Sequence, residues 1–347
     1  MNNSESTIFV SIASYRDPEL LPTIRSMITS ANNPKRLHIA VCWQDHRRQD
    51  IFQEVGLTLN QVDHAADFPV WQGEVDGALV DVIAVAPEHS EGTCWARSLC
   101  ESRYAGEDYF LQLDAHARFA ERWDTELIAL LEGLRETSQK PLLSAYVASY
   151  QPGPPEVRDP TPYRLVFDKF TPDGIPLFVA HAFSAEQPVR GCFISGHFLF
   201  ADGTFVLEVP NDPQIYFTGE EITMAMRAFT QGYDVYAPHR VLVWHQYGRE
   251  GRGLHWDDHP GDAAQEAWWV RDRRSRMYVR RLLVPDGGSL YDESTAGRSL
   301  AEFEHACGLS FSTRRVHPRV LSAERCGFFS DLDLRLPNDR STSPAQC

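Results

Sequence analysis

Short apolar runs alternate with segments of helical periodicity over the first 115 residues of the chain. The apolar runs are seven to nine residues long and predict buried β-strands at 8–14, 37–44, 78–86 and 108–114. Helices are predicted at 18–31 and 92–105. Pro18 and Pro22 are compatible with the first helix, because they fall in its opening turns, where proline is tolerated. Strands and helices in this order predict βαβ units and a mostly parallel sheet with helices on both faces.

The later part of the chain is less regular. Proline, glycine and isolated charges fill residues 150–190, which predicts an irregular excursion over a site. Strands are expected again at 193–203 and 241–247, on either side of an amphipathic helix at 220–233. An arginine-rich helix is expected at 263–283.

The length of 347 residues allows one large domain with an addition. We expect an α/β catalytic domain over 1–255 and a C-terminal helical or irregular extension packed on it over 256–347. Hydrophobic residues make up 43% and charged residues 23% of the chain, as in ordinary globular proteins.

Charge and cysteine content narrow the function classes. A net charge of −15 argues against nucleic acid as a partner, since polyanion binders carry basic excess. The chain shows neither a leader pattern nor about 18 consecutive apolar residues, so we expect no membrane anchor. Seven cysteines without a CxxC pair predict a reduced, cytoplasmic protein.

Candidate chemistry begins at the end of the strand 108–114. Asp114 and His116 are two residues apart, so in extended backbone their side chains point to the same face and can bind one ion. A carboxylate with an imidazole suits Mn²⁺ or Mg²⁺, with diphosphate oxygens as further ligands. His245 lies within an apolar strand and needs a partner, which a metal ion or a hydrogen bond in the core would provide. A solvated strand end is the alternative for the first pair.

Further candidates lie at other strand and helix ends. Ligands bind beyond the carboxyl ends of parallel strands, which groups 14–17, 44–46 and 114–116 into one neighbourhood. Asp45 could accept a hydrogen bond from a base or ribose, or it could form a turn. Arg97 could contact a phosphate or solvent. Glu220 and Glu221 open a helix after Gly219. Either they favour the helix dipole, or one of them binds sugar or acceptor hydroxyls.

Three long segments, 9–44, 92–124 and 208–249, resemble the cytosolic polypeptide N-acetylglucosaminyltransferases that modify hydroxyproline. The order of strand, helix, Asp-x-His, turn-rich loop, Gly-Glu-Glu and late histidine also resembles the GT-A glycosyltransferase layout. The resemblance covers about the first 250 residues and departs from the family at Ala115, where serine is more frequent.

The resemblance implies a GT-A fold and a retaining, metal-dependent transfer of N-acetylglucosamine from a UDP-sugar to a hydroxyl acceptor. The metal, Mn²⁺ or Mg²⁺, would be bound by a DXD-like motif with a late histidine. The implied metal ligands are Asp114, His116 and His245. The implied donor-binding residues are Ser14, Tyr15, Arg16, Asp45, Arg97 and Asp114. The implied catalytic residues, beside the donor sugar and acceptor, are Glu221 and Glu220, with Glu221 favoured.

Several alternatives stay open on the sequence. The same site could belong to a nucleotide-sugar hydrolase, to a nucleotidyltransferase or to a non-catalytic sugar-nucleotide-binding protein. The acceptor could be a protein, a glycan or a small molecule. The cluster His255, Asp257, Asp258 and His259 predicts a solvated loop or a lid over the donor. Trp268 and Trp269 could pack on the core, contact an acceptor or form a dimer face.

Overall fold

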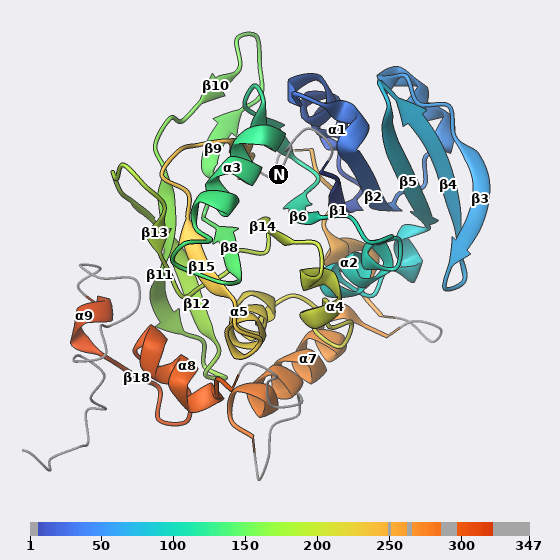
Figure 1. Cartoon of the computed structure of the whole chain (residues 1–347). Helices are drawn as coiled ribbons and strands as arrows, with labels where there is room; N and C mark the ends of the chain where they lie inside the picture. Colours follow the sequence, from blue (N-terminus) through green and yellow to red (C-terminus); the bar gives the residue numbers. More distant parts are fainter. Residues whose placement is uncertain (1–5, 249–250, 262–265, 286–296, 322–347) are drawn as a thin grey trace, which may run out of the picture.

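A computed structural model describes residues 6–248, 251–261, 266–285 and 297–321. Its main element is a ten-stranded sheet with the strand order β13-β15-β8-β14-β6-β1-β2-β5-β4-β3 (Figure 1). In that order the strands are Val189–Arg190, Asp234–Ala237, Pro141–Ser144, Phe198–Asp202, Tyr109–Asp114, Ile8–Tyr15, Leu37–Gln44, Ala78–Val85, Phe68–Val75 and Asn60–Ala65.

The centre of the sheet is parallel and its flanks are largely antiparallel. Strands β6, β1, β2 and β5 run parallel, and their register pairs Ala13 with Asp114 and Tyr15 with Gln44. On one flank β14 runs antiparallel to β6 and β8, and on the other β4 and β3 form an antiparallel meander after β5. The α/β class and the mixed sheet flanked by helices are confirmed. The hairpin β3–β4 was not predicted, because its polar face breaks the apolar runs.

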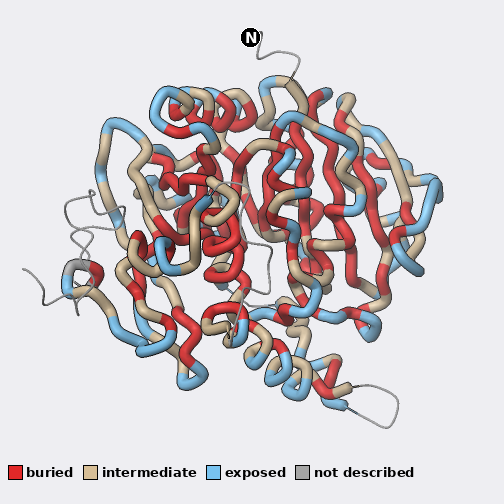
Figure 2. Tube along the Cα trace, turned by 60° about the horizontal axis from the view of Figure 1, so that its bottom comes forward, coloured by how far each residue is buried: buried red, intermediate tan, exposed pale blue. Residues whose placement is uncertain are grey.

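Helices cover both faces of the sheet and bury two separate cores. Helices α1 (Leu20–Ser30) and α3 (Trp123–Gly133) pack with the odd-numbered face of β6, which includes Leu111 and Leu113. Helices α2 (Thr93–Glu101) and α5 (Glu220–Thr230) belong to the core on the opposite face. Figure 2 shows buried residues concentrated along the central strands. The two-residue period of the strands therefore separates the two cores.

A second, four-stranded sheet has the order β10-β9-β16-β7 and carries part of the site. Its strands, in that order, are Val157–Arg158, Ala148–Gln151, Val243–His245 and Ala117–Phe119. Strand β16 pairs antiparallel with β7 and places His245 opposite Ala117. This pairing brings the late histidine next to His116, although the two residues are far apart in sequence.

The predicted excursion over 150–190 contains regular structure. Strands β11 (Tyr163–Phe170) and β12 (Pro176–Ala182) form an antiparallel hairpin with a register shift near Phe167. Leu165 and Phe167 are buried in the core shared with α2 and α5. Apolar packing of the hairpin thus overrides the irregular composition around it.

The C-terminal region packs against the same core. Helix α7 (Trp268–Leu283) contributes Val279 and Leu282, and α8 (Leu300–Cys307) contributes Phe303, to the cluster that contains Phe229 of α5. The shorter helices are α4 (Phe205–Glu208), α6 (His255–Asp258) and α9 (Pro318–Leu321), and the last strands are β17 (Leu309–Ser310) and β18 (Arg315–Val316). The 3₁₀ turns are Pro34–Arg36, Gln49–Val55 and Pro87–His89.

The division at residue 255 stays a prediction, and parts of the predicted extension, 286–296 and 322–347, lie outside the described residues. Among the helices that the structure describes, none combines the length and the apolar character that crossing a bilayer requires.

A buried histidine in β2 gives a prediction for stability. His38 lies between Glu107, whose Oε1 is 2.5 Å from Nδ1, and Asp81, whose Oδ2 is 3.3 Å from Nε2. Burial lowers the pKa of His38, but hydrogen bonds to Asp81 and Glu107 outweigh it and raise that pKa to about 9. The folded state therefore holds the proton more tightly than the unfolded state, whose histidine pKa is about 6.5.

This stabilisation is complete below about pH 6.5 and is lost as pH rises through about 9. In urea denaturation, His38→Gln should have a lower free energy of unfolding than the wild type. This deficit should be about 3 kcal/mol larger at pH 6 than at pH 10. His64→Gln, on the exposed face of β3, serves as the control with no such dependence. An equal H38Q deficit at the two pH values would show that His38 is not charged in the folded protein.

Candidate active site and metal centre

Asp114, His116 and His245 lie together beyond the carboxyl end of β6. One possible ligand atom from each residue lies within 4.8 Å of the others. Asp114 Oδ2 is 3.2 Å from His245 Nε2 and 3.8 Å from His116 Nε2. The three side chains predicted as metal ligands are thus brought together, two from the β6–β7 turn and one from β16.

The electrostatics of Asp114 and His245 suit a divalent cation. Burial disfavours the charged form of Asp114, but the hydrogen bond from His245 and the charge of Arg97 outweigh it and hold the pKa of Asp114 well below its usual range. Burial lowers the pKa of His245 more than Asp114 raises it, so the imidazole stays neutral. An ionised carboxylate and neutral imidazoles are the protonation states that metal binding requires. The donor set therefore fits Mn²⁺ or a similar ion.

Arg97 connects the aspartate to the helix α5. Its guanidinium is 2% exposed and donates to Asp114 Oδ1 at 2.8 Å and to Glu220 Oε1. Gln112 Nε2, from the middle of β6, is 3.5 Å from the same oxygen of Glu220. From the sequence, a phosphate or solvent was the expected partner of Arg97; in this structure its donors are directed to two carboxylates, and its contact with the donor stays a prediction.

Gly196 brings the turn before β14 against these groups. A Cβ at this residue would lie 3.0 Å from Glu220 Oε1 and 3.1 Å from Arg97 Nη1, so a side chain would crowd the ion pair. Its backbone N–H donates to Glu221 Oε1 at 3.1 Å, and its carbonyl accepts from Gln112. The glycine thus binds Glu221 directly and leaves room for the ion pair between Glu220 and Arg97.

The two glutamates have different surroundings. Glu220 is buried and faces Arg97, whereas Glu221 is partly exposed and hydrogen-bonded through one oxygen to Gly196. Burial raises the pKa of Glu221 to about 7. It also raises that of Glu220, although Arg97 opposes the shift. Glu221 is therefore the one of the pair that is open to a ligand.

The predicted donor-binding residues at the end of β1 contact a later segment. Ser14 is fully buried, and its hydroxyl has no hydrogen-bond partner within the described structure. The hydroxyl of Tyr15 donates to Asp258 Oδ2 at 2.7 Å, and Arg16 Nη1 donates to both oxygens of Asp258. Asp45 follows β2 and accepts from the backbone and side chain of Arg47. No contact joins Asp45 to the metal ligands in the described residues.

The cluster around α6 is more ordered than a solvated loop. His255 Nδ1 is 2.7 Å from the hydroxyl of Tyr216, and its Nε2 is 2.9 Å from that of Ser90. The His255 ring stacks on His259 at 4.0 Å, and burial lowers the pKa of His255 to about 3. Asp257, by contrast, is exposed. The lid hypothesis stays a prediction.

The tryptophan pair lies at the start of α7. Trp268 lies 6.2 Å from the ring of Trp256, and Trp269 is half exposed. Neither tryptophan is part of the two described cores, and the three alternatives for the pair stay predictions.

Sequence reasoning missed several polar residues around the metal ligands. His197 and Tyr247 flank His245, with ring centroids 4.7 and 4.3 Å from its own. Asp17 accepts a hydrogen bond from His116 at 2.8 Å. Tyr247 lies two residues after His245 and Gln112 two before Asp114, so the strand period that relates Asp114 to His116 could have found them.

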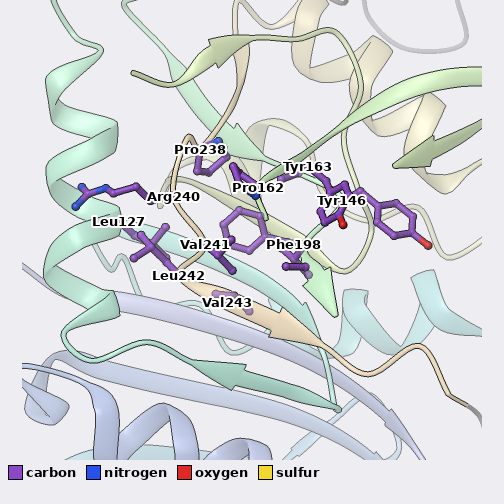
Figure 3. A pocket seen from close by; sticks show the side chains of 13 residues that line it. Leu127, Tyr146, Pro162, Tyr163, Phe198, Pro238, Arg240, Val241, Leu242 and Val243 are labelled. Carbon is purple, nitrogen blue, oxygen red and sulfur yellow. The ribbon is translucent and has the colours of Figure 1, made fainter. Parts of the chain in front are cut away.

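An apolar pocket lies next to β16, the strand that carries His245. It is lined mainly by aliphatic and aromatic side chains from α3, β9, β11, β14, β16 and the loops between them (Figure 3). The one charged residue in its wall is Arg240, which pairs with Glu126. Tyr146 forms part of this wall and also stacks on Tyr247. The pocket is thus connected to the site through Tyr146, and none of the candidate metal ligands lines it.

Solved structures with similar folds define the class. The structure of GalNAc-T7 with UDP, GalNAc and Mn²⁺ matches at a TM-score of 0.53 and 15% identity, over 71% of this chain and 45% of that one. The chain thus spans less than half the length of that relative. S. aureus TarS 1–349 with UDP-GlcNAc matches at a TM-score of 0.48 and 9% identity, over 86% of this chain and 70% of that one. The fold is that of a GT-A glycosyltransferase.

The family follows from the sequence itself. A family model described as Glycosyltransferase (GlcNAc) matches residues 7–306, which is most of the chain. The protein therefore belongs to this family of glycosyltransferases. No curated protein matches it. The narrower relation to the hydroxyproline-modifying enzymes stays a prediction.

Proposed function

We propose that the protein is a metal-dependent, retaining glycosyltransferase that moves N-acetylglucosamine from UDP-N-acetylglucosamine to a hydroxyl group. The cluster of Asp114, His116 and His245 at the end of a central parallel strand is the observation that carries this proposal. The family description supports the sugar. GalNAc-T7, which shares the fold, was solved with UDP and Mn²⁺, in support of the donor nucleotide and the metal.

Donor binding is assigned to the carboxyl ends of β1, β2 and β6. Asp114, His116 and His245 would hold Mn²⁺ or Mg²⁺, and Ser14, Tyr15, Arg16 and Asp45 would surround the nucleoside. A divalent cation there would neutralise negative charge on the leaving diphosphate. Arg97 keeps Asp114 ionised and oriented through their 2.8 Å hydrogen bond.

Glu221 is assigned to the sugar and acceptor. Gly196 holds one of its oxygens, which leaves the other to accept from a hydroxyl. In the proposed reaction the acceptor oxygen bonds to the anomeric carbon on the face from which the diphosphate leaves. The acceptor proton passes to the leaving phosphate oxygen, so configuration is retained. Positioning is then the main contribution of the two glutamates.

A protein hydroxyl is the acceptor that we propose, on the basis of the sequence resemblance to hydroxyproline-modifying enzymes. A reducing compartment fits the five described cysteines, which are buried and form no disulfide within the described residues. Cytoplasmic location is part of the same proposal.

Nucleotide release with a panel of sugar donors tests the function. With Mn²⁺ present, we expect UDP release to be fastest from UDP-N-acetylglucosamine and to increase when a hydroxyproline peptide is added. A proline peptide of the same sequence is the matched control. The anomeric coupling constant of the product, measured by NMR, should match that of the donor. Equal UDP release with and without any acceptor would identify a hydrolase instead, and an inverted product would refute retention.

A further inference from the structure

Asp17 lies directly behind one of the candidate metal ligands. It follows β1 by two residues, and its side chain is nearly buried although it carries a charge. Oδ1 accepts from the backbone N–H of Glu19 at 2.8 Å, at the start of α1. Oδ2 lies 2.8 Å from His116 Nδ1. The two oxygens therefore have separate partners.

A third contact holds this carboxylate from the segment that follows β16. Arg252 Nη1 lies 3.7 Å from Asp17 Oδ2, and Arg252 Nη2 donates to the carbonyl of Gln246 at 2.7 Å. The carboxylate is thus positioned from three sides before any ligand binds. Such a position resists rearrangement, because a rotated carboxylate would lose all three contacts.

The contact with His116 determines where the imidazole carries its proton. An ionised carboxylate only accepts hydrogen bonds, so Nδ1 must be the protonated nitrogen. In the neutral ring, Nε2 then has a free lone pair. Nε2 is the nitrogen on the side of Asp114, 3.8 Å from its Oδ2. Carboxylate groups that orient a metal-binding histidine in this way raise its basicity and its affinity for the metal.

His245 is held differently. Its Nδ1 is buried and has no hydrogen-bond partner among the described residues, and packing against the rings of His116, His197 and Tyr247 fixes its plane. Of the two candidate histidine ligands, His116 is therefore the one with a carboxylate on its remote nitrogen.

We propose that Asp17 is a positioning residue of the metal centre, which fixes His116 in the Nδ1-protonated tautomer so that Nε2 can bind the cation. This role deepens the proposed metal dependence and rests on it. From the sequence, Asp17 was expected only within the neighbourhood of 14–17, 44–46 and 114–116, and its contact with His116 supports the more specific role at the metal centre.

The substitution Asp17→Asn tests this role separately from the contact of Asp17 with the start of α1. The amide oxygen can still accept from Glu19 N–H, which places the NH₂ group against His116 Nδ1. That nitrogen must then accept, so the proton moves to Nε2, where it blocks the cation. A carboxylate-to-amide change that reverses a histidine tautomer in this way is known to impair a catalytic triad while its geometry is kept.

Asp159 offers a matched control. It forms the same kind of turn, in which Oδ1 accepts from the backbone N–H of Thr161 at 2.9 Å and Oδ2 accepts from the hydroxyl of Tyr163 at 2.8 Å. No metal ligand is among these partners. Asp159→Asn should therefore bind Mn²⁺ like the wild type.

Two measurements test the proposal. Calorimetric titration with Mn²⁺ should show affinity reduced by about 10- to 100-fold in Asp17→Asn, with thermal stability close to that of the wild type. ¹⁵N NMR of histidine-labelled, metal-free protein, with His116→Gln to assign the signal, should show protonated Nδ1 in the wild type and protonated Nε2 in D17N.

The outcomes separate the proposals. Protonated Nε2 in wild-type His116, or unchanged Mn²⁺ affinity in D17N, would overturn the role of Asp17 while the metal site stands. A wild type that binds no Mn²⁺ would overturn the metal site and the role of Asp17 together.

Discussion

Replacing Asp114 with alanine is expected to lower kcat/KM for transfer by about a thousandfold. Asp114 is the shared partner of His245 and Arg97, and its low pKa keeps it charged across the working range. Its loss removes the one carboxylate of the candidate metal cluster. Steady-state UDP release and Mn²⁺ titration of the same variant measure the effect.

Asp202 provides the matched control for this change. It too lies at a strand end and pairs with an arginine, Arg135, and its exposure is close to that of Asp114. It pairs in register with Tyr109, at the opposite end of β6 from Asp114. Asp202→Ala should keep both transfer and Mn²⁺ binding. Full transfer by Asp114→Ala with Mn²⁺ present would mean that the site is assigned wrongly.

Arg97→Met should have the largest effect on stability and should lower the free energy of unfolding by about 3–5 kcal/mol. The change leaves the carboxylates of Asp114 and Glu220 without the buried cation between them. Glu220 would then bind a proton more readily, because burial already raises its pKa. The deficit should therefore shrink as pH falls from 8 to 5. Urea denaturation at both pH values measures it.

Arg135→Met is the matched control for Arg97→Met at a partly exposed position. Arg135 also pairs with two carboxylates, Glu132 and Asp202, but solvent screens the pairs, so Arg135→Met should cost about 1 kcal/mol or less. Adding Glu220→Gln to Arg97→Met should restore part of the stability without restoring transfer. Equal effects of the two arginine substitutions would show that the buried ion pair is not important for stability.

The parallel centre of the fold could be predicted because each strand is buried on both faces. Strands such as 37–44 are continuous apolar runs, which periodicity recognises. The hairpins β3–β4 and β11–β12 could not, because β3 is mostly polar and exposed, and proline and glycine surround β11 and β12. Their strands form through long-range packing, which local composition does not encode.

For the site, it was easier to predict where the candidate residues lie than which residues they pair with. That Asp114 and His116 would share one face followed from their spacing at the end of a strand, whereas the place of His245 beside them was implied by the family resemblance. That Arg97 would pair with Glu220, 123 residues later, could not be foreseen, because it depends on where α5 lies. The contacts of Tyr15 and Arg16 with Asp258 depend in the same way on the path of a distant segment.

The charges gathered around Arg97 bear on the order in which ligands arrive. Asp17, Asp114, Glu220 and Glu221 supply up to four negative charges around the candidate metal site, against the cations Arg97 and Arg252, which are engaged with three of those carboxylates. A sugar nucleotide brings further negative charge from its diphosphate. Donor without a cation would thus enter a repulsive field. Under the proposed metal dependence, the enzyme would accept the cation–nucleotide complex, or nucleotide added after the ion. Cellular supply of that ion would then govern turnover as directly as supply of the sugar.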